Sequence, residues 1–309
     1  MAAAAPPNAS ALDLKVPRAL HERVIGRVFQ LFAWVSVLTA AGIVLVLFGQ
    51  SLAFFAEVGL GAFFGDTTWS PMFADAHFGI WPLVVGTLLT TLIAMIVALP
   101  LGLLAAVYLA ELAPERLRAW LKPALEILAG IPTVVYGYFA LNLVTPGLQA
   151  VIPGVAGSNA LAAGIVMGLM ILPIVTSLAE DAIYAVPQSL REGAYALGAS
   201  RTRTIFRVVL PSASSGIVAA VILAVSRAVG ETMIVAIAAG MEPRLTADPR
   251  EPVQTMTAYI VQVSFSERPS GSLEMQAIFA VGLMLFLSTL VFNAIAQRLR
   301  QKILRGGHT

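Results

Sequence analysis

The chain lacks cysteine and is poor in charge. None of its 309 residues is cysteine, which excludes disulfide bridges, thiolate nucleophiles and cysteine metal sites. Only 12% of the residues are charged and 58% are hydrophobic, whereas a soluble domain carries about 25% charged residues. These proportions predict an integral membrane protein. The formal net charge of +2 does not indicate a nucleic-acid partner, because the positive residues follow the membrane topology.

Lysine and histidine are also scarce, with three of each. None of the lysines stands in the G-x-x-x-x-G-K-[ST] pattern that cradles nucleotide phosphates, so the chain does not hydrolyse ATP through a P-loop. His21, His77 and His308 all lie outside the long apolar runs, which excludes a histidine metal site inside the membrane. We therefore predict a chain with no catalytic residues, metal ion or cofactor of its own.

Six apolar runs are long enough to cross about 30 Å of hydrocarbon as helices. They predict an all-α integral membrane protein with six transmembrane helices, preceded by a tail of residues 1–27 and followed by a tail of residues 301–309. Within the third run, Gly130 and Pro132 free backbone groups that the bundle must satisfy. The runs are Val28–Ala53, Leu83–Leu109, Pro123–Val144, Asn159–Leu178, Ser212–Ala239 and Met275–Ala296.

Lysine and arginine are distributed unevenly between the two sides of these runs. Fifteen of the nineteen fall in the two termini and in the loops after the second and fourth runs, and three fall in the loops of the opposite side. Cytoplasmic loops carry the excess of positive residues. The asymmetry predicts that both termini and the loop between the fourth and fifth runs are cytoplasmic. The remaining arginine, Arg227, lies inside the fifth run.

The loop between the fourth and fifth runs has a helical pattern of its own. Leu190, Ala194 and Leu197 recur at the spacing of one apolar face of a short helix. Gly198 follows where such a helix would end in the left-handed conformation that glycine adopts most easily. This pattern predicts a short amphipathic helix that ends in a sharp bend.

A second short helix is predicted directly after the bend, with Ser200 in position to cap its first turn and Pro211 at its end. The pair of helices has two interpretations. A helix that lies on a membrane surface carries large apolar anchors and a polar face rich in Lys and Arg. This segment instead has small residues at positions 193, 194, 196, 198 and 199, which suit close fitting into a groove. We favour a surface that docks a partner protein.

The same loop resembles the signature of ABC importer permeases, the EAA motif with its downstream glycine and its Leu-Pro ending. The similarity continues in three further motifs, and over about residues 80–300 the chain resembles the PstC-type permease subunit of a high-affinity phosphate importer. Gly193 stands where the family has an alanine. The residues that carry the resemblance are Glu192-Gly193-Ala194, Gly198, Leu210-Pro211, Glu111–Pro114, Gly130–Gly137 and Arg227–Met233.

The resemblance implies a type I, MetI-like fold in a bacterial inner membrane, with a permease domain over residues 80–300 and a cytoplasmic coupling loop over residues 184–211. It implies four kinds of partner: a second permease of the PstA type, a PstB-type ATPase dimer that binds ATP and Mg²⁺, a PstS-type phosphate-binding protein outside, and membrane lipid. It also implies the residues on which the ATPase docks, namely Glu192, Gly193, Ala194, Gly198, Leu210 and Pro211.

Arg227 is the second informative position, about fifteen residues into the fifth run and so expected near the middle of the membrane. An arginine there costs about 2.5–3.5 kcal/mol on insertion scales. Glu231 follows at the spacing of a helical ion pair. The pair could fix helix packing, or Arg227 could offer its planar charged fork to a tetrahedral oxyanion. We favour the second interpretation and predict that Arg227, Glu231 and Thr232 line a substrate pathway.

Other charges near the predicted cytoplasmic ends receive structural interpretations. Glu126 stands one turn after Lys122, which predicts an ion pair at the membrane interface. Glu180 and Asp181 end the fourth run and are interpreted as a charged face near the loop between the fourth and fifth runs.

Three alternatives to a PstC-type phosphate permease stay open. Sulfate and molybdate permeases resemble the chain as well, so the residues do not choose the oxyanion. A PstA-type role in the same complex is the second alternative. The third, from a different class, is a membrane scaffold or sensor that docks a cytoplasmic partner without transporting anything.

Overall fold

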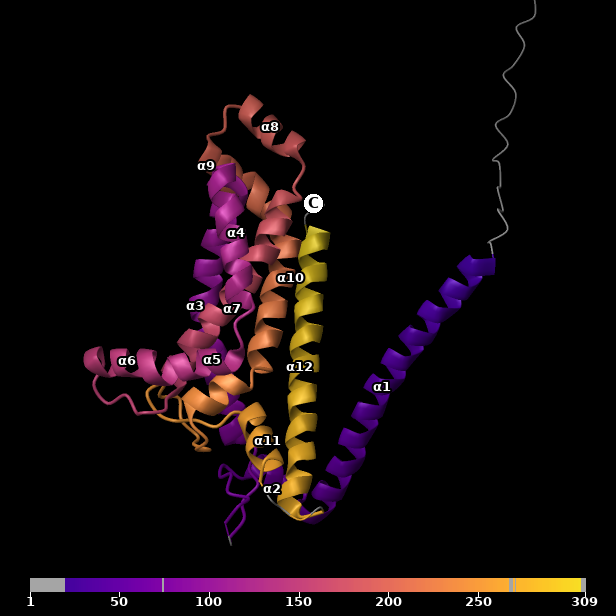
Figure 1. Ribbon diagram of the computed structural model, residues 1–309, viewed down its shortest axis with the longest axis vertical. Helices are drawn as coiled ribbons and strands as arrows, with labels where there is room; N and C mark the ends of the chain where they lie inside the picture. Colours follow the sequence, from indigo (N-terminus) through magenta and orange to yellow (C-terminus); the bar gives the residue numbers. More distant parts are fainter. Residues whose placement is uncertain (1–19, 74, 267–268, 270, 307–309) are drawn as a thin grey trace, which may run out of the picture. The chain divides into compact units, whose positions relative to one another are not determined.

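A computed structural model of the protein describes residues 20–73, 75–266, 269 and 271–306. Within these ranges the regular elements are helical, apart from one isolated antiparallel bridge between Trp69 and Phe78. The chain divides after Val46 into two compact units, and the second of them holds every element from α2 to α12 (Figure 1). The α-helices are α1 (Leu20–Val58), α2 (Leu60–Gly65), α3 (Trp81–Val107), α4 (Glu115–Ala129), α5 (Thr133–Phe139), α6 (Thr145–Val151), α7 (Ala160–Tyr184), α8 (Gln188–Ala196), α9 (Arg201–Thr204), α10 (Leu210–Val229), α11 (Met256–Ser264) and α12 (Leu273–Gly306). Four π-helical segments join them: η1 (Tyr108–Leu112), η2 (Ala140–Val144), η3 (Ile205–Val209) and η4 (Val235–Ala239).

Six helical stretches are long and apolar enough to cross a membrane, which confirms the predicted all-α protein with six spans. Each of them extends beyond its predicted run at one end or both. At the two termini, α1 begins at Leu20, inside the predicted tail, and α12 continues to Gly306. Residues 1–19 and 307–309 of the predicted tails lie outside the described residues. The spans are Val24–Val58, Trp81–Leu112, Thr133–Val151, Ala160–Tyr184, Arg201–Val229 and Leu273–Arg298.

The third span differs from its prediction. The run Pro123–Val144 is not one helix, because α4 ends at Ala129 and the apolar span begins only at Thr133. The chain bends between them at Gly130 and Pro132, where Pro132 supplies no N–H. The Tyr136 hydroxyl donates to the Leu128 carbonyl at 2.8 Å, so this tyrosine satisfies one of the backbone groups freed by the bend.

The fifth span also differs from its prediction. A continuous helix over Ser212–Ala239 is wrong, because α10 ends at Val229 and the backbone of Glu231 and Thr232 is not helical. Helical structure resumes at Met233 and continues through η4 to Ala239. At the other end, the predicted second short helix is not separate, since α9 continues through η3 into α10 without interruption. The result is one long helix over Arg201–Val229 followed by a break.

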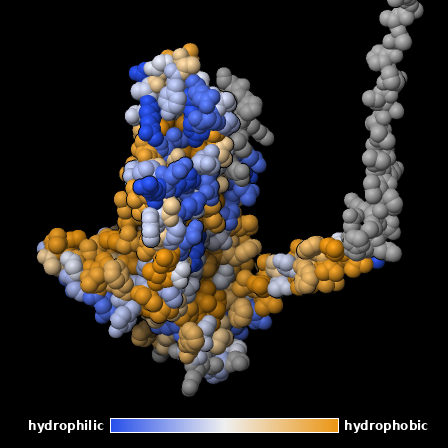
Figure 2. All heavy atoms as spheres, turned by 45° about the horizontal axis from the view of Figure 1, so that its top comes forward, coloured by the Kyte–Doolittle hydropathy of each residue, from blue (hydrophilic) through white to orange (hydrophobic). Residues whose placement is uncertain are grey.

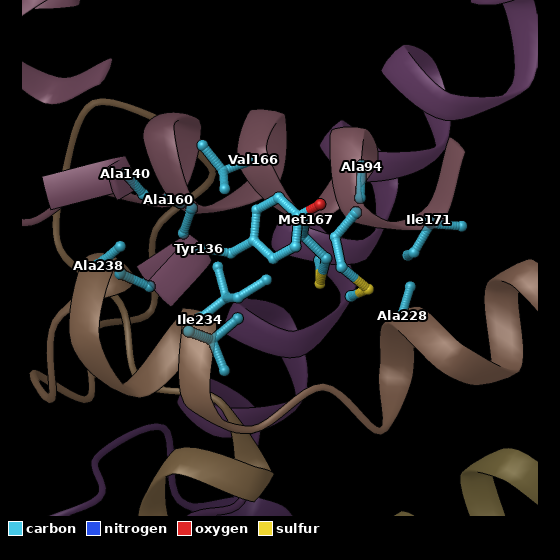
Figure 3. Packing of buried hydrophobic residues seen from close by; sticks show 14 of the residues in the cluster. Ala94, Tyr136, Ala140, Ala160, Val166, Met167, Ile171, Ala228, Ile234 and Ala238 are labelled. Carbon is cyan, nitrogen blue, oxygen red and sulfur yellow. The ribbon is translucent and has the colours of Figure 1, made fainter. Parts of the chain in front are cut away.

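Within the second unit, α3, α5, α7, α10 and η4 share a buried core. Tyr136 from α5 and Met167 from α7 are buried in it, and Figure 3 shows the tyrosine ring among residues of α7 and η4. Ile234 and Ala238 reach this core from the segment after the break. Because the two sides of the break pack into the same core, the interruption of the fifth span has a fixed geometry.

The second unit has two distinct ends (Figure 1). We call them the α8 end, where α8 and α9 lie and where α3 finishes, and the α11 end, where α3 and α12 begin. At the α11 end the loop between α2 and α3 folds over aromatic residues, and Trp69 meets Tyr259 of α11 edge to face at 4.9 Å. Phe54, Phe63 and Phe78 complete this buried aromatic cluster.

Hydrophilic residues gather at the α8 end, as Figure 2 shows. The arginines of α8, α9 and η3 lie here, as do those in the first turn of α4. The structure therefore places together two of the positive loops from which the orientation was predicted. The cytoplasmic location of the α8 end stays a prediction.

A fusion experiment tests the orientation. We expect a reporter that is active only in the cytoplasm to work after residue 200 and at the C-terminus and to fail at residue 255, because excess positive charge is retained in the cytoplasm. Colony assays of the three fusions, normalised to protein level, give the result. Activity at residue 255 would reverse the orientation.

An acidic residue and a histidine form a titratable pair in the loop of the α11 end. His77 Nδ1 lies 2.6 Å from Asp66 Oδ2, and its Nε2 lies 3.5 Å from Asp75. The hydrogen bond to Asp66 raises the pKa of His77 above its usual range. The loop contact that this pair supplies is therefore complete at pH values below the ordinary histidine pKa of about 6.5. It is lost as the pH rises through the raised pKa.

The prediction is that Asp66→Asn lowers the pKa of His77 toward its ordinary value, measured by NMR titration of histidine-labelled protein. Asp75→Asn is the matched control, because its carboxylate is farther from the ring and exposed. We expect the smaller change from this control. Equal shifts in the two variants would show that general charge, and not the short hydrogen bond, sets the pKa.

Candidate functional site

The predicted site residues form two groups at different places in the second unit. Arg227, Glu231 and Thr232 lie together at the break that follows α10, and we call this group the ion-pair site. The residues predicted to dock a partner lie on α8, on the bend after it, and at the start of α10. The 20 residues of α10 separate the two groups, a length of about 30 Å at 1.5 Å per residue.

The ion-pair site occupies the end of a helix instead of its middle. Arg227 is two residues from the last residue of α10, Val229. The predicted continuous helix around it is therefore wrong, because the apolar sequence continues past the break and conceals it. The depth of Arg227 near the middle of the membrane stays a prediction. Its cation lies in the last turn of α10, where the helix dipole favours positive charge.

Glu231 performs two functions with its two carboxylate oxygens. Its Oε2 lies 3.3 Å from Arg227 Nη1, which confirms the predicted ion pair. Its Oε1 accepts from the backbone N–H groups of Met233 and Ile234 at 3.2 and 3.4 Å. Glu231 therefore caps the helical segment after the break while it holds the arginine at the end of the helix before it. The sequence spacing predicted the pair but not the cap.

A second connection ties the break to α11. The Thr257 hydroxyl donates to the Glu231 carbonyl at 2.7 Å, and it lies 3.0 Å from the Thr255 hydroxyl, which caps α11. All three residues are buried. The Thr232 hydroxyl donates to the Gly230 carbonyl at 3.2 Å. Thr232 thus stands beside the ion pair, with its hydroxyl engaged by the end of α10.

Burial differs sharply across the ion pair. The side chain of Glu231 is 2% exposed, whereas that of Arg227 is 43% exposed. Among the described residues, Glu231 is the only ion-pair partner of Arg227. The carboxylate is thus enclosed by the protein, whereas the arginine side chain stays accessible. A planar group with several donors can bind two oxygens of a tetrahedral anion at once.

The first docking helix and its bend agree with the sequence prediction. α8 ends at Ala196, and Gly198 has a φ of 79°, the left-handed conformation that the pattern predicted. Ser200 caps α9 by accepting from the Arg203 N–H at 3.4 Å. Glu192 and Gly193 are exposed on α8 and Pro211 is exposed at the start of α10, while Leu210 packs against the core of the α8 end.

The apolar face of α8 is directed outward. Leu190 is 45% exposed and Leu197 is 90% exposed, so the stripe does not pack on the body of the protein. The residue of α8 that is buried is Arg191, which the sequence pattern did not indicate. An exposed apolar stripe on a helix anchored by a buried arginine leaves that stripe available to a partner protein.

The acidic residues at the end of α7 pair with α4, which corrects one further prediction. Glu180 is buried, and its carboxylate lies 2.5 Å from Arg118 and 3.2 Å from Lys122 of α4. Lys122 also approaches Asp181 at 3.3 Å. The predicted pair of Lys122 with Glu126 is wrong, because the bend after α4 turns that helix against α7. These contacts hold α4 to α7 at the α8 end.

The arrangement of helices is that of ABC transporter permeases. A chain of the MetNI methionine ABC transporter in an inward facing conformation superposes with a TM-score of 0.55 at 17% identity, covering 73% of this chain and 94% of that one. A chain of a bacterial ABC transporter involved in the import of the acidic polysaccharide alginate superposes with a TM-score of 0.62 at 14% identity, covering 91% and 98%. These likenesses confirm the predicted fold class.

The chain belongs to the family of binding-protein-dependent transport system inner membrane components, whose sequence model matches residues 98–305. It is 32% identical over 320 residues to the phosphate transport system permease protein PstC of Mesorhizobium japonicum, covering 97% of this chain and 96% of the relative. It is 36% identical to PstC 1 of Mycobacterium tuberculosis, covering 74% of each chain. It is 34% identical to the probable ABC transporter permease protein YqgH of Bacillus subtilis, covering 78% of this chain and 77% of the relative. The protein is therefore a multi-pass inner membrane permease, and the resemblance inferred from its motifs is confirmed.

Proposed function

We propose that this chain is the PstC-type permease subunit of an ATP-driven importer of inorganic phosphate and forms half of its translocation pathway. The names of the relatives support the substrate, since phosphate transport permeases match almost the whole chain. The observation that carries the proposal is the exposed guanidinium of Arg227, fixed by a buried carboxylate at the break of the fifth span. Interrupted helices are where membrane transporters commonly bind their substrates.

The ion-pair site suits an anion that must bind and then leave. Phosphate carries roughly −1.5 charge near neutral pH, by analogy with phosphoryl groups, and needs charge-assisted donors in a low-dielectric passage. Arg227 supplies such donors, while Glu231 competes for the same cation at 3.3 Å. The competition holds the side chain in place when no anion is present and weakens the complex when one is. A passage that must release its ion requires such moderate binding.

In this proposal the energy of ATP hydrolysis reaches the permease through the α8 end. A cytoplasmic ATPase dimer of the PstB type docks on the exposed surface of α8, at Glu192, Gly193 and Ala194, and on the bend at Gly198. Leu210 and Pro211 begin the helix that leads from this surface to the ion-pair site. The ATPase binds the ATP and Mg²⁺, and this chain contributes no catalytic group. A PstA-type permease forms the other half of the pathway, and a PstS-type protein delivers phosphate from outside.

Uptake of radiolabelled phosphate into proteoliposomes tests this function. The purified complex of the two permeases and the ATPase is reconstituted, and uptake is measured with ATP supplied on the ATPase side and the binding protein on the opposite side. We expect uptake that requires both ATP and the binding protein. Radiolabelled sulfate and molybdate are tested in the same assay, because uptake of either one in place of phosphate would assign the pathway to another oxyanion. Absence of all three activities would favour a scaffold or sensor.

A further inference from the structure

Glu111, at the end of the second span, contacts both α8 and α9, the helices on either side of the Gly198 bend. Its carboxylate accepts from Arg191 of α8, at 3.2 Å from Nε and 2.8 Å from Nη2. Its backbone carbonyl accepts from Arg201, the first residue of α9. One residue of η1 therefore binds the helix before the Gly198 bend and the helix after it. We call these three residues the clamp.

The clamp is mostly buried, unlike an ordinary surface ion pair. The side chain of Arg191 is 11% exposed and that of Glu111 is 8% exposed. Arg191 also donates to the carbonyls of Ile183 and Val186 at the end of α7. Its guanidinium thus joins three elements, namely η1, α7 and α8. Breaking a buried ion pair by removing one partner leaves an uncompensated charge, which is strongly unfavourable.

Glu111 is held by a helix that reaches the opposite end of the bundle. α3 and η1 form one continuous helical stretch from Trp81 to Leu112. Near its start, the Thr87 hydroxyl accepts from the backbone N–H of Met256, the first residue of α11, at 3.0 Å. One residue earlier the backbones of α3 and of the loop before α11 nearly touch, because a Cβ on Gly86 would lie 2.4 Å from the Gln254 carbonyl oxygen. α3 is therefore fixed to the loop that precedes α11.

The first turn of α11, which follows this loop, contacts the ion-pair site. Thr257, next to Met256, donates to the carbonyl of Glu231 at 2.7 Å, and Glu231 holds Arg227. Contacts of buried groups thus run from α8 through the clamp to α3, and from α3 through Thr87, Met256 and Thr257 to Glu231. The direct route along α10 is not the only connection between the two groups of site residues.

We propose that Glu111 is a positioning residue that makes α3 move with α8, so that α3 transmits movement of the docking surface to the ion-pair site. This inference rests on the proposed function, because it assumes that a partner moves α8 to drive transport. Loss of the Glu111 carboxylate should leave the ATPase docked and active but separate hydrolysis from transport. The role concerns the orientation of α8 and requires no contact between Glu111 and phosphate.

The first experiment compares Glu111→Gln with Glu115→Gln in the complete reconstituted complex. Glu115 is exposed in the first turn of α4 and makes no ion pair with the described residues. Glu115→Gln therefore removes the same charge without breaking an ion pair. The readout is the ratio of phosphate imported to ATP hydrolysed. We expect this ratio to fall roughly tenfold or more in Glu111→Gln, because both hydrogen bonds from Arg191 lose their charged acceptor. The ratio should stay unchanged in Glu115→Gln. A merely structural role would lower hydrolysis and uptake together, and an unchanged ratio overturns the proposal.

The second experiment needs neither a partner nor a substrate. The chain has no cysteine, so cysteines introduced at Leu104 of α3 and Ser189 of α8, both exposed, can be spin-labelled selectively. In the full chain in lipid nanodiscs we expect one narrow distance distribution, broadened by Glu111→Gln and not by Glu115→Gln. An unchanged distribution in Glu111→Gln overturns the clamp even where transport is confirmed. Conversely, broadening together with a wild-type complex that transports no phosphate upholds the clamp and overturns the proposed function.

Discussion

Arg227→Gln should reduce phosphate uptake by at least about a hundredfold while the complex still assembles, because two charge-assisted hydrogen bonds of roughly 1.5–3 kcal/mol each are lost. The glutamine amide keeps donors but neither the charge nor the fork. Assembly is retained because the Arg227 side chain is 43% exposed and is not part of the packed core. Uptake per assembled complex, measured in proteoliposomes, is the readout. Arg244→Gln is the control, since Arg244 is also exposed and also pairs with a nearby glutamate, at 3.2 Å.

Further variants separate the charge of Arg227 from its geometry. Arg227→Lys keeps the charge but not the bidentate fork, and we expect intermediate uptake. Glu231→Gln removes the competing charge while its amide oxygen can still accept from Met233 and Ile234. Its effect should therefore be milder than that of Arg227→Gln. Glu231→Ala removes the cap as well, and its additional loss measures the contribution of the cap.

A purely structural ion pair predicts a different order. In that case each single neutralisation would impair assembly, and the double variant Arg227→Gln with Glu231→Gln would recover it. An anion-binding role predicts that the double variant assembles but transports no better than Arg227→Gln. Near-normal uptake by the double variant would therefore eliminate Arg227 as the phosphate donor.

The sequence was most informative where one residue type is needed for a local backbone conformation. Gly198 and Ser200 were both assigned correctly, because a left-handed helix end and a helix cap depend on the few residues around them. The six spans were also predicted, since apolar runs of this length have few other structures in a membrane. Local rules therefore supplied the elements and the bend after α8.

The sequence was least informative where contacts join distant segments. Glu111 and Arg191 are 80 positions apart, and no spacing rule relates them. The buried Glu180 pairs with two cations of α4 that lie about 60 positions earlier in the chain. The break after α10 was missed for a different reason, since residues 233–239 are as apolar as the helix before them and continue the hydrophobic run. Hydropathy shows that such a segment is in the membrane but not whether its backbone is interrupted.

Replacement of Gly198 should have the second large effect, by changing the direction of the bend between α8 and α9. Its φ of 79° is strained for a residue with a side chain, and no atom lies within 4 Å of the position that a Cβ would take. A valine there therefore meets backbone strain alone, of about 1–3 kcal/mol. The chain can relieve this strain by changing φ, which turns α8 relative to α9.

A glycine at the other end of the protein provides the matched control. Gly59 has a φ of 75° and likewise has open space around its Cβ position, but it precedes α2 at the α11 end. Gly59→Val thus introduces the same kind of strain away from the docking surface. Gly198→Asn is the conservative variant, because asparagine adopts the left-handed conformation more readily than other residues with a side chain.

We expect Gly198→Val to insert normally, to lose most of the copurifying ATPase and to lose uptake in proportion. Gly198→Asn should retain most of both activities, because it preserves the left-handed conformation and with it the orientation of α8. Gly59→Val should resemble the wild type per unit of folded protein, since its strain does not reach α8. Copurification of the ATPase and phosphate uptake are the two measurements. Undiminished ATPase binding together with normal uptake in Gly198→Val would show that the direction of this bend does not determine docking.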